Sequence, residues 1–134
     1  MALVFTPPFV QTPQFKPVAF VNADGTTIKD ILTAGSLGTR VDKIGATSTD
    51  TSARVVQIYV NNGVSDFLIG SIALGALGGA DGASVAGNLM TTAVNPWITD
   101  GVLTIPTGYK IRAGITTAVT ATKQVNVIVS GGDF

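Results

Sequence analysis

Apolar and polar side chains alternate in several short runs along the chain. Between residues 54 and 60, Val56, Ile58 and Val60 fall on one face of an extended strand. A period of two with β-branched residues is typical of a half-buried strand. The same alternation recurs at residues 109–115 and 124–129. With the shorter runs included, we expect about eight strands spaced roughly 8 to 12 residues apart, which predicts a β-sandwich or barrel.

The segment Arg40–Val60 contains two strand-like runs joined by five small polar residues, Ser48–Ser52. Ser, Thr and Asp side chains bind their own backbone in turns, so we expect one hairpin here, with both strands in the middle of a sheet. Asn22–Gly25 and Asn61–Gly63 carry the Asp-Gly and Asn-Gly signals of tight turns. They predict further hairpins.

Residues 65–74 differ from the other runs because both faces are apolar. Phe67 and Ile69 fall on one face, and Leu68 and Ile72 on the other. A strand of this kind is usually covered on both sides. We expect the opposing sheet to cover one face and another subunit to cover the other, with Phe67 and Ile69 as candidate interface residues.

The first 17 residues are interrupted by prolines at positions 7, 8, 13 and 17. Proline fixes extended or polyproline geometry and removes a ladder donor, so we expect an arm over residues 1–17 and a sandwich domain over 18–134. The arm lies either along its own domain or on a neighbouring subunit or larger partner, and the second is favoured because an apolar arm in water promotes aggregation. Its candidate contact residues are the large apolar ones: Leu3, Val4, Phe5, Phe9, Val10 and Phe15.

The same prolines, and the absence of a basic segment at the start, argue against a signal peptide or membrane anchor. Three other segments carry weaker signals. Gly75–Ser84 resembles a flexible loop, and it lacks the Gly-Lys-Ser/Thr ending of a phosphate-binding loop. Residues 85–93 fit a short strand or one helical turn, and Ser130–Phe134 reads as a flexible tail.

Trp97 is the only tryptophan and follows a chain bend at Asn95-Pro96. Tryptophan buries a large area and needs one hydrogen-bond partner. We expect Trp97 in the core first, at a subunit interface second, and as a sugar-stacking platform third.

The composition limits the kinds of partner and of catalytic or metal-binding residue that the chain can have. The 134 residues suit one domain. Eight basic and eight acidic residues cancel, and no basic stripe is visible, so we expect neither a nucleic-acid nor an anionic-membrane partner. The chain contains no Cys, His or Glu. Thiolate chemistry and the commonest general base and metal ligand are therefore missing, and catalysis would have to come from Asp, Lys, Tyr, Ser or Thr.

The remaining polar residues are explained by turns and exposed faces. An Asp pair might serve a glycosidase, yet four of the eight carboxylates lie in turn-like contexts: Asp24, Asp50, Asp81 and Asp100. Ser48, Asp50 and Ser52 would form a weak calcium site at best. Lys110 and Arg112 share a strand face that is either solvated or met by a partner carboxylate. We therefore expect no enzyme, cofactor or metal.

Several segments together resemble a known family. In order they are FTPPFVQTP, VNADGTTIKDILTAG, ATSTDTSARVVQIYV, a Gly-rich loop, IPTGYKIRAGITTAV and a closing SGGDF. This order resembles small virion structural proteins of tailed bacteriophages, of the capsid decoration or cement type with a β-sandwich or jelly-roll fold. Such proteins commonly sit as trimers on the outside of the icosahedral shell.

The resemblance implies a non-enzymatic virion protein on the capsid exterior. Its partners would be further copies of itself, as a homotrimer, and the major capsid protein or other virion proteins. The alternative is a tail-tip or fibre module that binds a host glycan, for which Trp97, Tyr59 or Tyr109 would supply the stacking surface.

Overall fold

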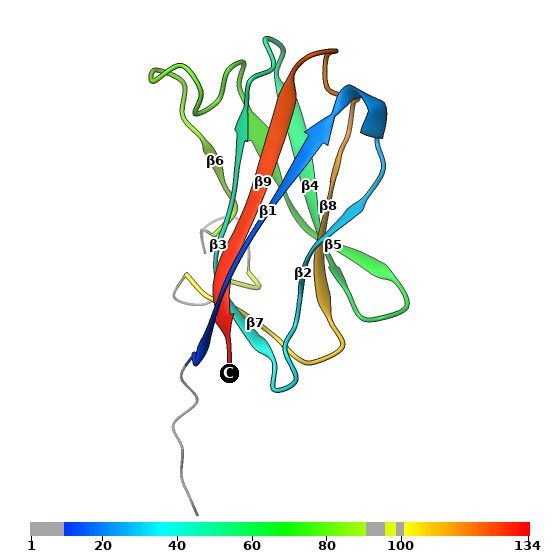
Figure 1. Cartoon of the computed structure of the whole chain (residues 1–134), viewed down its shortest axis with the longest axis vertical. Helices are drawn as coiled ribbons and strands as arrows, with labels where there is room; N and C mark the ends of the chain where they lie inside the picture. Colours follow the sequence, from blue (N-terminus) through cyan, green and yellow to red (C-terminus); the bar gives the residue numbers. More distant parts are fainter. Residues whose placement is uncertain (1–9, 91–95, 99–100) are drawn as a thin grey trace, which may run out of the picture.

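The alternating runs form strands in the computed structural model, which describes residues 10–90, 96–98 and 101–134 (Figure 1). A single 3-10 turn, η1 (Asn22–Asp24), accompanies them. The strands of the described residues are β1 (Thr12–Val21), β2 (Lys29–Thr33), β3 (Thr39–Ser48), β4 (Arg54–Asn61), β5 (Asp66–Leu74), β6 (Gly87–Asn88), β7 (Leu103–Ile105), β8 (Lys110–Ile115) and β9 (Gln124–Asp133).

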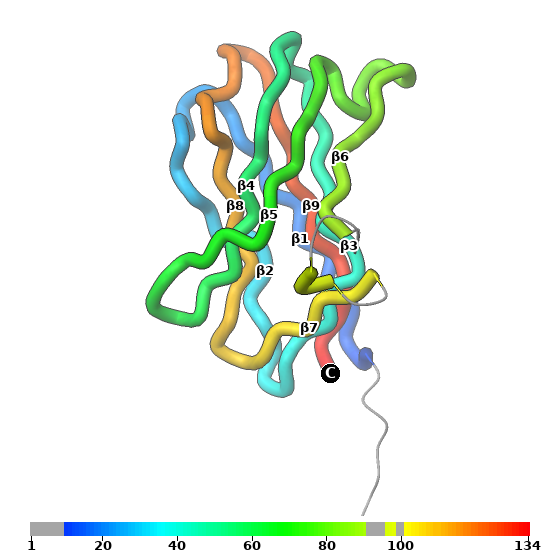
Figure 2. The backbone as a smooth tube through the Cα atoms, turned by 180° about the vertical axis from the view of Figure 1, so that it is seen from behind, coloured from blue at the N-terminus to red at the C-terminus, as the bar shows by residue number. Residues whose placement is uncertain are grey.

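The strands form two antiparallel sheets that pack face to face (Figures 1 and 2). Sheet 1 has the order β1-β9-β3-β6, and β7 pairs with β3 beside β6. Sheet 2 has the order β2-β8-β4-β5. The predicted all-β, single antiparallel sandwich is confirmed.

The pairing follows the jelly-roll scheme. β1 pairs with β9, β2 with β8, β3 with β6 and β7, and β4 with β5. The chain therefore behaves as one long hairpin wound around the core, and the first four strands alternate between the sheets.

The core lies between the sheets and is built by the predicted alternation. Val56, Ile58 and Ile111 are fully buried from sheet 2, and Val125 and Val127 from sheet 1. Burying these side chains is worth about 1.5–3 kcal/mol each. Tyr109, expected to face inward, is half-buried against this core.

Two predicted hairpins are wrong. β3 and β4 lie in different sheets, so residues 49–53 cross from one sheet to the other instead of closing a hairpin. Asn22–Gly25 makes a similar crossing from β1 to β2. Alternation reports which face of a strand is buried and carries no information about its neighbour. The mid-sheet position of both strands is correct, and Asn61–Gly63 does lie in a true hairpin between β4 and β5.

The second part of the predicted arm is a strand. Thr12–Pro17 belong to β1, which pairs along its whole length with β9. Proline is tolerated there because β1 is the edge strand of sheet 1. The candidate residues Leu3, Val4, Phe5 and Phe9 lie outside the described part of the chain.

Two segments expected to be flexible are held by hydrogen bonds. The tail forms the end of β9, where a Cβ on Gly131 would come within 1.9 Å of the Arg40 carbonyl oxygen. In the Gly-rich loop, the Leu77 amide donates to the Asp50 carbonyl, and the Gly78 carbonyl accepts from Ser48. Residues 85–93 supply the short strand β6, although residues 91–93 are not described.

Candidate functional site

An apolar groove is lined by residues of β4, β5, β7 and the turn after β7. Figure 2 shows the backbone of β7 and of the β4–β5 hairpin towards one end of the sandwich. It encloses about 290 Å³, and none of the described residues that line it is charged. The lining residues are Val60, Phe67, Leu68, Ile69, Trp97, Leu103, Thr104, Ile105, Pro106 and Tyr109. The groove therefore lies at the edge of the core, where β5 and β7 are edge strands among the described residues.

Three large apolar side chains of the groove are exposed. Phe67 is 54% exposed, Leu68 53% and Trp97 62%, above the buried side chains of Leu103 and Ile105. Scattered exposed apolar residues are ordinary, whereas a contiguous patch usually marks a binding surface. This surface is the strongest candidate site in the described part of the chain.

A bulge in β5 explains why both faces of this strand are apolar. Ile58 pairs with Gly70 and Tyr59 with Leu68, so Ile69 is an extra residue in β5. The bulge reverses which residues face the core. Ile72 faces inward beyond it, and on the other side Phe67 lies opposite the inward-facing Val60. Cover by a second subunit is thus not needed to explain the pattern, and it stays a prediction.

The structure brings together three candidate residues from two distant segments. Phe67, Ile69 and Trp97 line one groove, and the expected core position of Trp97 is wrong because its side chain is largely exposed. Sequence reasoning missed Leu68 and Leu103 as groove residues. The sequence shows that both are apolar. They come together only through the bulge in β5 and the pairing of β7 with β3.

The other described candidates lie on sheet 1, away from the groove. Phe15 is 66% exposed and borders a second groove of about 240 Å³ with Lys43 and Ile128. Val10 is half-buried, and its side chain occupies the space beside Gly132 that a Cβ there would fill.

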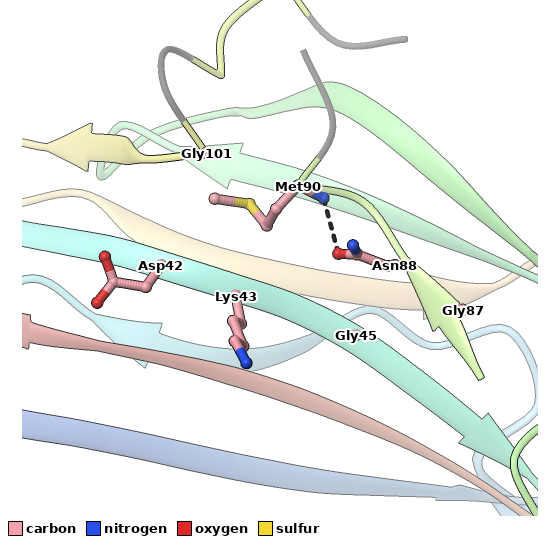
Figure 3. Close-up of a pocket in the computed structure, with 7 residues that line it drawn as sticks. All are labelled: Asp42, Lys43, Gly45, Gly87, Asn88, Met90 and Gly101. Carbon is pink, nitrogen blue, oxygen red and sulfur yellow. Dashed lines mark hydrogen bonds between the residues drawn. The ribbon is translucent and has the colours of Figure 1, made fainter. Parts of the chain in front are cut away.

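A more polar pocket of about 450 Å³ lies beside β3 and β6 (Figure 3). Its lining includes Asp42, Lys43, Asn88 and Met90. The Asn88 side-chain oxygen accepts a 2.9 Å hydrogen bond from the Met90 amide, and Asp42 is paired with Arg40 at 3.0 Å. Asn88 and Asp42 are therefore engaged in local structure. No group of three metal-ligating side chains occurs among the residues described.

Asp50 is fully buried in the crossing between β3 and β4. This crossing lies at the end of the sandwich opposite to β7 (Figure 1). Its Oδ1 accepts hydrogen bonds from the Ser52 amide and the Thr120 hydroxyl, both at 2.9 Å. Its Oδ2 accepts from Arg54 Nε at 2.8 Å and from the Thr120 amide at 2.9 Å. We call these four residues the Asp50 cluster; it ties the β3–β4 crossing to the β8–β9 loop.

The Asp50 cluster controls the charge state of its carboxylate. Burial alone would raise the pKa of Asp50, but the amides of Thr120 and Ser52 and the Arg54 guanidinium outweigh it. They hold the pKa of Asp50 well below its ordinary value. Because both oxygens face hydrogen-bond donors, Asp50 is used here as a structural anion and not as a cation ligand.

Lys110 and Arg112 meet carboxylates of their own chain. Lys110 Nζ lies 3.1 Å from Asp30, and Arg112 lies 2.7 Å from Asp30 and 2.8 Å from Asp66. The pair therefore bridges neighbouring strands of sheet 2 and the start of β5. This arrangement differs from both the solvated face and the partner contact considered from the sequence.

No protein-family model matches the sequence, and no curated protein matches it. No described helix has the length and apolar character needed to span a membrane. The function is therefore argued from the chain's own surfaces.

Proposed function

We propose that this protein is a non-enzymatic virion structural protein that decorates and stabilises a bacteriophage shell as an oligomer. The observation that carries the proposal is the apolar groove on a jelly-roll sandwich. Jelly rolls are common in viral capsids, and apolar burial supplies most of the stability of permanent assemblies. The neutral overall charge of the chain suits contact with protein more than with nucleic acid.

The construction of the two ends supports a structural role. Rigid sheets, closed at one end by the Asp50 cluster, would hold the groove in one shape. A preformed apolar surface binds with little ordering cost, which suits a protein that must add to a completed shell. The proposed partners are further copies of the chain, as a homotrimer, and the major capsid protein or another virion protein on the capsid exterior.

The direct test is the copy number and position of the chain on purified particles of the phage that encodes it. Quantitative mass spectrometry and an electron cryo-microscopy map should find many copies distributed over the outer shell. Absence from the particles, or a few copies confined to the tail, would overturn the proposal.

A host-recognition module that binds a glycan is the second candidate. The exposed Trp97 beside Tyr109 favours it, because aromatic faces offer an amphipathic stacking surface. Against it, Thr104 and Tyr109 are the polar side chains of the groove lining, and sugar hydroxyls need several placed hydrogen-bond partners. Glycan binding that is lost in Trp97→Ala would support this candidate over the shell role.

Removal of the N-terminal residues gives a second test of the shell role. The deletion must stop at residue 9, because removing residues 2–16 would also remove half of β1. We expect the chain without residues 2–9 to fold and to bind particles more weakly. Unchanged decoration of particles would exclude these residues as the fastener.

A further inference from the structure

We propose that the apolar groove receives residues 1–9 of a second copy of this chain, so that copies associate by exchanging N-terminal arms. The inference deepens the proposed function, because it names the partner of the groove and rests on that function for the oligomer. It commits to one occupant, the segment MALVFTPPF of a neighbouring copy.

The chemistry of the two surfaces is complementary. Residues 1–9 contain Leu3, Val4, Phe5 and Phe9 and no charged side chain. The described residues of the groove lining are uncharged as well, and three of them, Phe67, Leu68 and Trp97, expose more than half of their surface. Contact between them would remove apolar surface from water on both sides without burying a charge.

The place where the described chain begins supports docking on another copy. The Gln11 amide donates to the Asp133 carbonyl, so the β1–β9 ladder continues to the end of β9. Val10 then packs beside Gly132. The start of β1 and the C-terminus lie at the same end of the sandwich as β7 (Figure 1), so the described chain begins at the end that carries the groove.

An arm that leaves in this direction reaches its own groove only by turning back across β9 and β3. Nine extended residues span about 30 Å, so length alone does not decide between the two copies. Pro7 and Pro8 favour continued extension, because each fixes its backbone in polyproline geometry. Docking on a neighbouring copy needs no such turn, and we therefore assign Leu3, Val4 and Phe5 to the groove of a second copy.

Trp97 provides the test, since it is the only tryptophan and lines the groove. Its emission and the sedimentation of the full chain are measured together over a dilution series. We expect association at high concentration with emission at short wavelength. On dilution the chain should dissociate, and its emission should shift to longer wavelength at the same concentrations, because Trp97 becomes exposed to water.

The variant Leu3→Ser/Val4→Ser/Phe5→Ser should weaken association by at least about tenfold, with long-wavelength emission at the concentrations where wild type is associated. The matched control Leu37→Ser/Val64→Ser/Val85→Ser also removes three exposed apolar side chains, none of which lines the groove. It should associate as wild type does.

A covalent measurement covers the case in which the triple variant folds poorly. The chain has no cysteine, so Val4→Cys and Leu68→Cys can be placed in separate copies and mixed under oxidising conditions. A disulfide-linked pair is expected, and the pairing of Val4→Cys with Val85→Cys should be far slower.

Three outcomes would overturn arm exchange: short-wavelength emission independent of concentration, which places the arm in its own groove; a chain that stays monomeric throughout; or an arm variant that associates normally. Chains that stay monomeric yet cover the shell would overturn arm exchange and leave decoration of the shell standing. Chains that exchange arms but are absent from particles would overturn decoration of the shell and leave arm exchange standing.

Discussion

The two ends of the sandwich differ in polarity and in burial. At one end the Asp50 cluster seals the gap between the sheets with a buried carboxylate whose two oxygens accept four hydrogen bonds. At the other end the core continues into an open apolar groove between β5 and β7. A buried charge with complete partners fixes a local geometry, whereas exposed apolar side chains lower the free energy only when something covers them.

This comparison assigns the two ends different tasks. The Asp50 cluster should matter for the stability of the isolated chain, and the groove should matter for its association. Substitutions at the two ends should therefore separate the free energy of unfolding from the tendency to associate.

The largest effect is expected for Asp50→Ala. It leaves the mostly buried Arg54 guanidinium and the Thr120 amide without their acceptor, which should lower the free energy of unfolding by about 3–5 kcal/mol. Urea denaturation measures the change. The control Asp42→Asn breaks the more exposed pair with Arg40 and should cost less than about 1 kcal/mol. Equal losses in both variants would contradict a special role for the cluster.

The free energy of unfolding should depend on pH differently in Asp50→Ala and in wild type. The folded pKa of Asp50 is held below its ordinary value of 3.8, so its stabilising effect is present above that pH and is lost as the pH falls through the folded pKa. The difference in unfolding free energy between wild type and Asp50→Ala should therefore shrink as the pH is lowered below about 4. A difference that stays constant down to pH 2 would show that ionised Asp50 is not its source.

Gly131→Ala tests the backbone near the open end. Its Cβ would meet the Arg40 carbonyl oxygen at 1.9 Å, so β9 and β3 would have to separate. We expect a loss of about 1–3 kcal/mol in thermal or urea unfolding. Gly75→Ala is the matched control, because nothing lies within 4 Å of its Cβ position. Tolerance of Ala at position 131 would mean that the end of β9 is held less tightly than its contacts indicate.

Leu68→Ser should have the smallest effect on stability. Its side chain is already half-exposed on an edge strand, so the free energy of unfolding of the monomer should change by less than about 0.5 kcal/mol. The same substitution should weaken association, which is measured by sedimentation. A large loss of stability would show that the groove belongs to the core and is not a separate binding surface.

Sequence reasoning predicted the strands and their buried faces better than their neighbours. The alternation of Val56 and Ile58 follows directly from burial on one side of a sheet. The pairing of β3 with β9 depends instead on residues far apart in the chain, which no local pattern records. Pro13 was misread because proline is excluded from central strands but not from an edge strand.

The groove was predictable only in pieces. Phe67, Ile69 and Trp97 each stood out as candidate interface residues, yet nothing in the sequence placed them together. Their meeting depends on the bulge at Ile69 and on the position of β7, both of which arise from tertiary packing. Asp50 was correctly assigned to turn chemistry, but its burial depends on Thr120, 70 residues away.

The most direct test of the two-ended account is sedimentation of wild type, Leu68→Ser and Asp50→Ala at one concentration, with the folded fraction of each measured by circular dichroism. The account predicts that wild type associates, that Leu68→Ser is a folded monomer, and that the folded fraction of Asp50→Ala still associates. A Leu68→Ser chain that associates like wild type, or folded Asp50→Ala chains that remain monomeric, would contradict it.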